Sequence, residues 1–238
     1  MVGSNTPRAN RLLAALPPAA YRRLLPKLDE VTLHSEERLF EATGPLHFAY
    51  FPTSSIVTSS YTADANGSRA KAWSIGCEGM VGISLFLRSP TRDNRDKQAD
   101  VQVGGLAFRI SAPALRAEFR RAGALQHLLL RYVFALVTQA SQLSVCTQYH
   151  TLEQRLCHFL LRAFDRVNDD KVFVTQARIG ELLGVRRESI TEIAWRIQEA
   201  GIIRYSRGHM TLMSREKLEG RACACGGIIR RAFEAVSI

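Results

Sequence analysis

A short run of side chains at residues 186–192 carries the hydrogen-bonding groups that nucleic-acid bases and phosphates require. An arginine can donate two parallel hydrogen bonds to guanine O6 and N7, and a glutamate can accept one from the cytosine N4 amine. A hydroxyl near a helix N-terminus can donate to a phosphate oxygen. The pattern predicts that Arg187 and Glu188 read bases and that Ser189 binds phosphate. The residues of the run expected to face DNA are Arg186, Arg187, Glu188, Ser189, Thr191 and Glu192.

Two helices joined by a sharp turn are expected to position this run. Residues 175–183 begin with a threonine suited to capping a helix, and Gly184 breaks that helix. A second helix is expected from about Arg186 to Ala200, where Gly201 stops it. The apolar positions recur at helical spacing in both segments, and they are Ile179, Leu182, Leu183, Ile190, Ile193, Ala194 and Ile197.

A short β-hairpin is expected directly after the second helix. Residues 202–206 and 209–213 are rich in strand-forming side chains and flank the turn Arg207-Gly208. Helix, turn, helix and hairpin in that order predict a winged helix-turn-helix whose second helix lies in the DNA major groove. Arg207 in the wing is expected to contact DNA, while Thr175 and Gln176 in the first helix are expected to bind phosphate.

The same stretch resembles a bacterial family of regulators. The residues Ile179-Gly180-Glu181-Leu182-Leu183-Gly184-Val185-Arg186-Arg187-Glu188-Ser189-Ile190 are similar to the motif I-G-x-x-x-G-x-[ST]-R-E-[ST]-[VI] of the Crp/Fnr superfamily of transcription regulators. The resemblance continues through residues 201–203 and the wing, and more loosely over the rest of the chain. It implies an α+β protein with an N-terminal β-roll, a long dimerisation helix and a DNA-binding domain. RNA polymerase is a further partner that the resemblance implies.

Composition is compatible with this resemblance. The 238 residues are 46% hydrophobic, which suffices for real cores, and the net charge of +10 favours a polyanionic partner. Met1 to Pro18 lacks the pattern of a signal peptide, and no stretch of about 18 uncharged apolar residues predicts a membrane span. The five scattered cysteines are typical of a reducing compartment, so a cytoplasmic location is expected.

Residues 1–122 are expected to form the β-roll domain. After a helical lead-in from Leu12 to Leu28, broken by prolines, short strand-forming segments alternate with glycines. Strands are expected on each side of Gly104-Gly105, and Asp64-Ala65-Asn66-Gly67 is expected to form a hairpin turn.

Residues 123–149 are expected to form the dimerisation helix, and residues 150–238 the DNA-binding domain. Between Ala124 and Gln148 there is no proline or glycine. A coiled-coil-like spacing predicts a seam with a second subunit at Leu125, Leu129, Tyr132, Leu136, Gln139 and Leu143. A second apolar set lies partly off this seam and consists of Leu130, Val133, Phe134 and Val137. The alternative is a central helix buried within a monomer. A further helix is expected from Thr151 to Val167.

The β-roll departs from the family pattern where cyclic nucleotides bind. In nucleotide-binding members a glutamate after the glycine turn holds the ribose hydroxyl, and an Arg-Ser pair about ten residues later holds the phosphate. Here Ile83 occupies the glutamate position and Lys97-Gln98 the Arg-Ser position, with Arg95 close by. Lysine cannot replace the arginine fork, so cyclic AMP is not expected to bind. The candidate effector-pocket residues are Gly79, Gly82, Ile83, Lys97 and Gln98.

No cofactor or metal is expected from motifs. The cysteine set begins at Cys77, so an N-terminal iron–sulfur cluster is excluded, and His47, His127 and His158 are in no haem-ligand motif. Cys223-Ala224-Cys225 could be plain thiols or a redox or metal pair.

No enzymatic motif such as a P-loop or a Gly-x-Ser-x-Gly elbow occurs, so the expectation is a non-enzyme. The function expected is a sequence-specific transcription regulator that binds a pseudo-palindromic operator as a homodimer, with an unidentified small-molecule effector or none. The alternatives are non-specific DNA binding, and an assembly protein with a vestigial helix-turn-helix.

Overall fold

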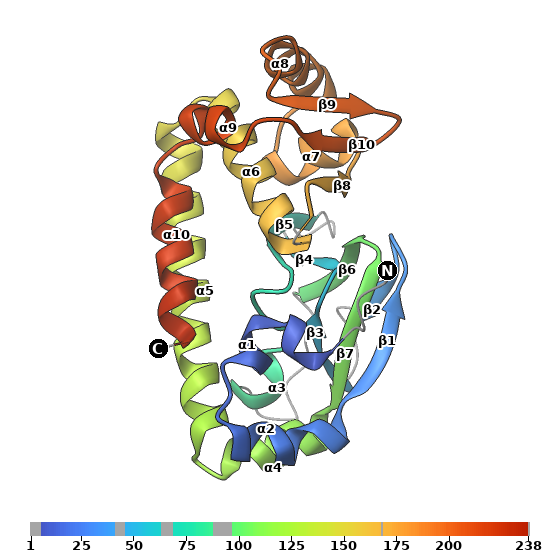
Figure 1. The fold of residues 1–238 in the computed structure, drawn as a ribbon, viewed down its shortest axis with the longest axis vertical. Coiled ribbons are helices and arrows are strands. Elements are labelled where there is room, and N and C mark those ends of the chain that lie inside the picture. Colours follow the sequence, from blue (N-terminus) through green and yellow to red (C-terminus); the bar gives the residue numbers. More distant parts are fainter. Residues whose placement is uncertain (1–5, 41–45, 63–68, 88–96, 168, 238) are drawn as a thin grey trace. The chain divides into compact units, whose positions relative to one another are not determined.

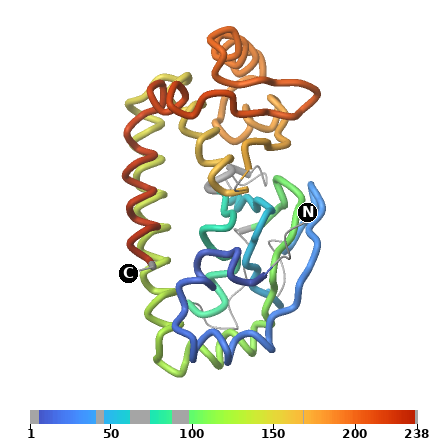
Figure 2. Tube along the Cα trace, viewed as in Figure 1, coloured from blue at the N-terminus to red at the C-terminus, as the bar shows by residue number. Residues whose placement is uncertain are grey.

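The structure, a computed structural model, describes residues 6–40, 46–62, 69–87, 97–167 and 169–237 (Figures 1 and 2). The chain divides into two compact units. Unit 1 comprises Met1–Val137 and Ala232–Ile238, and unit 2 comprises Thr138–Arg231. The long helix α5, Ala124–Tyr149, therefore contributes its first half to one unit and its second half to the other.

Unit 1 opens with short helices separated by prolines, as the sequence predicts. These are α1 (Arg11–Ala14) and α2 (Pro18–Leu24). The buried Asn10 caps α1, because its Oδ1 accepts from the backbone N–H groups of Leu12 and Leu13. Its Nδ2 donates to the carbonyl oxygens of Pro52 and Gly79 over 2.8 Å each. One buried amide thus ties the lead-in to the end of β3 and to the loop at Gly79.

Two antiparallel sheets form the roll. The first has the order β1-β7-β3, with β1 at Asp29–Leu33, β3 at Phe48–Pro52 and β7 at Gly105–Ser111. The second has the order β2-β6-β4-β5, with β2 at Arg38–Phe40, β4 at Ile56–Thr62, β5 at Arg69–Ile75 and β6 at Lys97–Val103. The strands predicted around Gly104-Gly105 are confirmed as β6 and β7, which belong to different sheets. The predicted turn at Asp64-Ala65-Asn66-Gly67 lies outside the described residues.

The core of unit 1 lies where helices pack on the roll. Besides α3 (Ser84–Leu87) and α4 (Ala112–Arg120), the first half of α5 contributes Leu125, Leu129, Tyr132 and Leu136. The Tyr132 hydroxyl accepts from the backbone N–H of Met80 (3.0 Å) and donates to its carbonyl (2.9 Å). A Cβ on Gly79 would lie 2.4 Å from that hydroxyl, so only glycine fits beside the ring.

A charged group fastens the end of α4. Glu118 lies 2.7 Å from Lys27 Nζ and 3.7 Å from Arg23 Nε, with Arg121 at 3.9 Å. The hydrogen bond from Lys27, aided by the nearby arginines, lowers the pKa of Glu118 although burial alone would raise it.

Unit 2 follows the predicted order of helices and wing. Helix α6 (Leu152–Val167) begins with a reciprocal cap, in which the Gln154 N–H donates to Thr151 Oγ1 and the Thr151 N–H donates to Gln154 Oε1. Helices α7 (Gln176–Leu183) and α8 (Arg187–Glu199) come next. The sheet β8-β10-β9 is built from β8 (Lys171–Phe173), β9 (Ile203–Ser206) and β10 (His209–Leu212).

Two further helices complete unit 2 and return the chain to unit 1. Helix α9 spans Arg215–Arg221 and α10 spans Cys225–Glu234. Gln142 of α5 donates from Nε2 to the Cys225 Sγ over 3.2 Å, so the start of α10 lies against the second half of α5 (Figure 1). In unit 1, Phe233 near the end of α10 packs edge-on against Tyr132.

Candidate nucleic-acid interface

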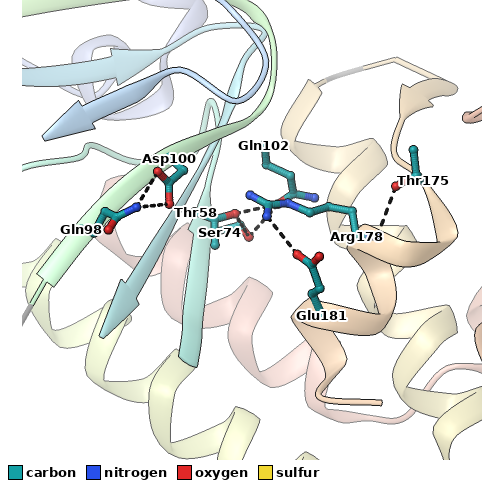
Figure 3. Close-up of polar contacts among 8 residues, drawn as sticks. All are labelled: Thr58, Ser74, Gln98, Asp100, Gln102, Thr175, Arg178 and Glu181. Carbon is teal, nitrogen blue, oxygen red and sulfur yellow. Dashed lines mark hydrogen bonds and ion pairs between the residues drawn. The ribbon is translucent and has the colours of Figure 1, made fainter. Parts of the chain in front are cut away.

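The turn between α7 and α8 has the geometry that the glycine pattern predicts. Gly184 adopts the left-handed conformation with φ of 68°, and its N–H returns to the Gly180 carbonyl. A Cβ on Gly180 would lie 2.9 Å from the Val185 carbonyl oxygen, so the two helices approach closely there. Thr175 caps α7 by accepting from the Arg178 N–H over 3.2 Å, and Arg178 pairs with Glu181 over 3.1 Å (Figure 3).

A side-chain hydrogen bond connects the two helices on their exposed side. The hydroxyl of Thr191 in α8 donates to Oε1 of Gln176 in α7 over 2.8 Å. The side-chain oxygen of Gln176 therefore accepts a hydrogen bond within the protein. Its Nε2 amine supplies the N–H donors that a phosphate would need. Thr191 also lies 3.1 Å from the Arg187 carbonyl. Gln176 and Thr191 thus link the two helices on their exposed side.

The first turn of α8 presents the predicted reading residues. Arg186 is the N-cap and its side chain makes no capping hydrogen bond, while Arg187 and Glu188 are exposed. Ser189 is half-buried. The buried face of α8 holds Ile190, Ile193, Ala194 and Ile197, as the helical spacing predicts. The polar run thus lies at a helix N-terminus, where backbone N–H groups favour an anion.

Glu192 and the wing complete this surface. Glu192 Oε1 lies 3.8 Å from the Arg196 guanidinium one turn later, so the two form an ion pair within α8. Arg207 and Gly208 have φ of 49° and 84° and form the predicted two-residue turn. Arg207 is exposed at the tip of the wing.

Sequence reasoning missed one large side chain on the outer face of α8. Trp195 is 60% exposed and lies one turn after Thr191 and Glu192. A tryptophan on an otherwise polar helix face is the signal that could have identified it, because its large ring and its N–H make tryptophan common at interfaces.

The candidate effector-pocket residues are packed within the roll. Gly79 lies against Tyr132, Gly82 has φ of 105° and a Cβ there would lie 3.2 Å from Ala49, and Ile83 packs on the apolar core. Gln98 donates from Nε2 to both carboxylate oxygens of Asp100 at 2.8 and 3.0 Å (Figure 3). Arg95 and the Lys97 side chain lie outside the described residues.

A second polar group of the roll also hydrogen-bonds internally. The Thr58 and Ser74 hydroxyls both lie within 3.0 Å of Gln102 Oε1 (Figure 3). Thr58, Ser74 and Gln102 therefore direct these polar groups to one another.

Most residues of the predicted dimer seam lie on the face of α5 that packs within its own subunit. Leu125, Leu129, Tyr132 and Leu136 are each at most 6% exposed, because they fill the core of their own subunit. Gln139 is buried as well and accepts a hydrogen bond from Arg162, while Leu143 is half-buried. Instead, most of the second apolar set is exposed along one face of α5. Leu130 (46%), Phe134 (72%) and Val137 (57%) are exposed, Val133 is half-buried, and Val145 (41%) continues the exposed face.

Among the described residues one helix, α5, is long and apolar enough to cross a membrane by length and composition. Core helices of soluble proteins share that composition, and α5 buries Leu129 and Tyr132 completely in the protein core.

The structure brings the Cys223-Ala224-Cys225 pair next to Cys146, at the end of α5, and His150, directly after it, which sequence reasoning did not connect with the pair. Ligand atoms of Cys146, His150, Cys223 and Cys225 all lie within 4.8 Å of one another. The missed signal is the four-residue spacing of Cys146 and His150, whose N–H donates to the Cys146 carbonyl. Burial raises the pKa of the Cys146 thiol, and it lowers the pKa of the neighbouring His158 to about 3, so this imidazole is neutral.

A β-roll, a long helix and a winged helix-turn-helix define a class of two-domain DNA-binding regulators. Residues 154–221 match the model of the Crp-like helix-turn-helix domain. We find no significant match among curated protein sequences.

Solved structures share the fold of nearly the whole chain. A Crp/Fnr-family transcriptional regulator from Eubacterium rectale is 17% identical with a TM-score of 0.57, covering 90% of this chain and 98% of that one. FixK2 from Bradyrhizobium japonicum is 16% identical with a TM-score of 0.61, covering 83% and 98%. A protein from Silicibacter pomeroyi described as a cAMP-binding regulatory protein is 19% identical with a TM-score of 0.64, covering 90% and 95%.

The domain match and the shared fold agree with the resemblance: residues 154–221 are a Crp-like helix-turn-helix domain, and the chain shares the fold of Crp/Fnr transcription regulators. A helix-turn-helix of this kind is a DNA-binding domain.

Proposed function

We propose that the protein binds a pseudo-palindromic DNA operator as a two-fold homodimer, reads it with Arg187 and Glu188, and does not respond to cyclic AMP. The observation that carries base reading is the first turn of α8. Its two charged side chains are exposed, and its N-cap has no side-chain hydrogen bond. Arg187 then donates to a guanine and Glu188 accepts from a cytosine, while Ser189, Thr175 and Gln176 hold phosphates. RNA polymerase in the cytoplasm is the partner that the family implies.

The homodimer is supported by the exposed apolar face of α5. Leu130, Phe134 and Val137 recur at spacings of four and three residues, as in a helix that packs on a copy of itself. A two-fold axis along such a pair would present two α8 helices to half-sites about one helical turn, roughly 34 Å, apart.

The exclusion of cyclic AMP is supported by the side chains of the roll. Ile83 offers no acceptor to a ribose hydroxyl and packs on apolar neighbours, so that hydroxyl would be buried without a partner at a cost of about 1–3 kcal/mol. The Gln98 amide is already engaged by Asp100. The relative from Silicibacter pomeroyi shares the fold, but at 19% identity the two chains need not share the residues of a binding site. A less polar effector, or none, fits the described residues better.

Selection of bound DNA from a random library tests the operator. We expect an inverted repeat whose half-sites each contain a position fixed by Arg187. Enrichment of no sequence would indicate non-specific binding, and failure to retain any DNA would indicate an assembly role.

Titration calorimetry with cyclic AMP and cyclic GMP tests the effector. We expect no heat of binding at micromolar ligand. A micromolar dissociation constant together with tighter operator binding would show that the roll is a nucleotide sensor.

A further inference from the structure

Four potential metal ligands converge inside unit 2. Cys146 lies in the last turn of α5 and His150 directly follows this helix, while Cys223 lies between α9 and α10 and Cys225 begins α10. The Sγ atoms of Cys146 and Cys223 lie 3.5 Å apart, and Cys225 Sγ lies 3.4 Å from His150 Nδ1. The three cysteines are buried and the histidine is half-buried.

We propose that these four side chains bind one Zn²⁺ ion in a tetrahedral Cys₃His site. With Zn–S and Zn–N bonds of about 2.3 and 2.0 Å, tetrahedral geometry separates two sulfurs by about 3.8 Å and a sulfur from a nitrogen by about 3.5 Å. The two distances in the structure are close to both values. A polynuclear iron–sulfur cluster would place iron and sulfide atoms between the cysteines and hold their sulfurs farther apart than this.

The surroundings of the sulfurs suit thiolates bound to a cation. Gln142 Nε2 donates to Cys225 Sγ over 3.2 Å. His158 Nδ1 lies 3.9 Å from Cys146 Sγ and 3.7 Å from Cys223 Sγ. Cys225 is also the first residue of α10, where the helix dipole favours negative charge. Donors of this kind orient ligands and offset the net negative charge of three thiolates around Zn²⁺.

The proposed zinc site is of the structural kind and not of the catalytic kind. Four protein ligands fill the tetrahedron and leave no open position for water or substrate. Binding replaces three thiol S–H bonds by Zn–S bonds and releases the three protons to solvent. The ion would fasten the α9–α10 connection to the end of α5, directly before α6 begins the DNA-binding fold.

Metal content of the full-length protein, purified with a non-thiol reductant, is the first test. Mass spectrometry of the metal is expected to find about one Zn²⁺ per chain. After chelation the melting temperature should fall, and adding Zn²⁺ should restore it. Replacement by Co²⁺ should give the absorption bands of tetrahedral cobalt with thiolate-to-metal charge transfer.

Matched variants separate the site from general effects on folding. Cys225→Ser and His150→Ala should each lose the cobalt spectrum and weaken Zn²⁺ binding by more than the roughly 10–100-fold typical of losing a hydrogen-bond partner of a ligand. His150→Cys should retain the ion, because it supplies another thiolate at the same position. Cys77→Ser, a buried cysteine of unit 1, should keep full metal content.

Three results would overturn the proposal. One is a well-folded protein that binds neither Zn²⁺ nor Co²⁺. Another is undiminished metal content in His150→Ala together with Cys225→Ser. The third is a Cys146–Cys223 disulfide on mild oxidation without metal binding by the reduced protein, which would assign the pair to redox chemistry instead.

Discussion

The hydroxyl of Thr191 in α8 donates to the side-chain carbonyl of Gln176 in α7 over 2.8 Å. This hydrogen bond joins the two helices of the helix-turn-helix on their exposed side. In the proposed function it helps to set the position from which Arg187 and Glu188 would reach the bases.

Thr191→Val should weaken binding to every operator sequence by a similar factor, because it removes a hydrogen bond worth about 0.5–1.5 kcal/mol that orients the helices. Thr191→Ser, which keeps the hydroxyl, is the control and should bind nearly as the parent does. Mobility shifts on a panel of single-base operator variants provide the measurement. A changed preference at one base pair would mean that Thr191 reads a base directly.

Arg187→Ala and Glu188→Ala should each cost about 1–3 kcal/mol on the best operator and relax preference at one base pair. Exposed Arg204 in β9 offers a charge control for Arg187→Ala, since Arg204→Ala lowers the net charge equally outside the reading turn. Binding curves on matched and mismatched sites measure both effects. Uniform weakening across all sequences would exclude base reading by these side chains.

Phe134→Asp should dissociate the proposed dimer while leaving the chain folded, because Phe134 is 72% exposed. Leu136→Asp should act differently, since this residue is 3% exposed in the core and truncating a buried leucine alone costs about 2–5 kcal/mol. Sedimentation and thermal melts distinguish the two outcomes. A folded, dimeric Phe134→Asp protein would contradict the proposed interface.

Tyr132→Phe should destabilise unit 1 by about 1–3 kcal/mol, because the backbone N–H and carbonyl of Met80 would lose their common partner in a buried place. Denaturant unfolding of the full chain measures the loss. An unchanged unfolding midpoint would show that water replaces the hydroxyl.

The lowered pKa of Glu118 predicts that part of the free energy of unfolding is lost at acid pH. Its folded-state pKa is lowered from the ordinary value of 4.5, chiefly by the hydrogen bond from Lys27. The stabilisation is therefore complete at neutral pH and is lost as the pH falls through the lowered pKa. Glu118→Gln should lower the free energy of unfolding at pH 7 and flatten its decline at acid pH. Parallel declines in both proteins would assign the acid sensitivity to other groups.

Local patterns were enough to predict the DNA-binding motif. The cap at Thr175, the left-handed Gly184, the apolar spacing of α8 and the turn at Arg207-Gly208 depend on neighbouring residues alone, so the sequence carries them directly. The β-roll was predicted as a class, because alternating strand-formers and glycines indicate it without fixing the order β2-β6-β4-β5.

The errors concern contacts between distant segments. Both apolar faces of α5 fit a helical period, and spacing alone could not tell which faces the core, since that depends on where Met80 and Phe233 pack. Similarly, Cys146 and Cys223 are separated by 77 residues, and only the return of the chain along α5 brings them together.

The division of α5 between the two units bears on how the protein can be cut into pieces. A fragment beginning at residue 150, where the sequence suggested a domain border, would lack the Gln139 partner of Arg162 and the Gln142 donor to Cys225. A fragment beginning at residue 138 would retain both. The same holds for recombination between related genes. Exchange of a DNA-binding domain should give a folded protein when the exchanged segment includes the second half of α5, from Thr138 onward.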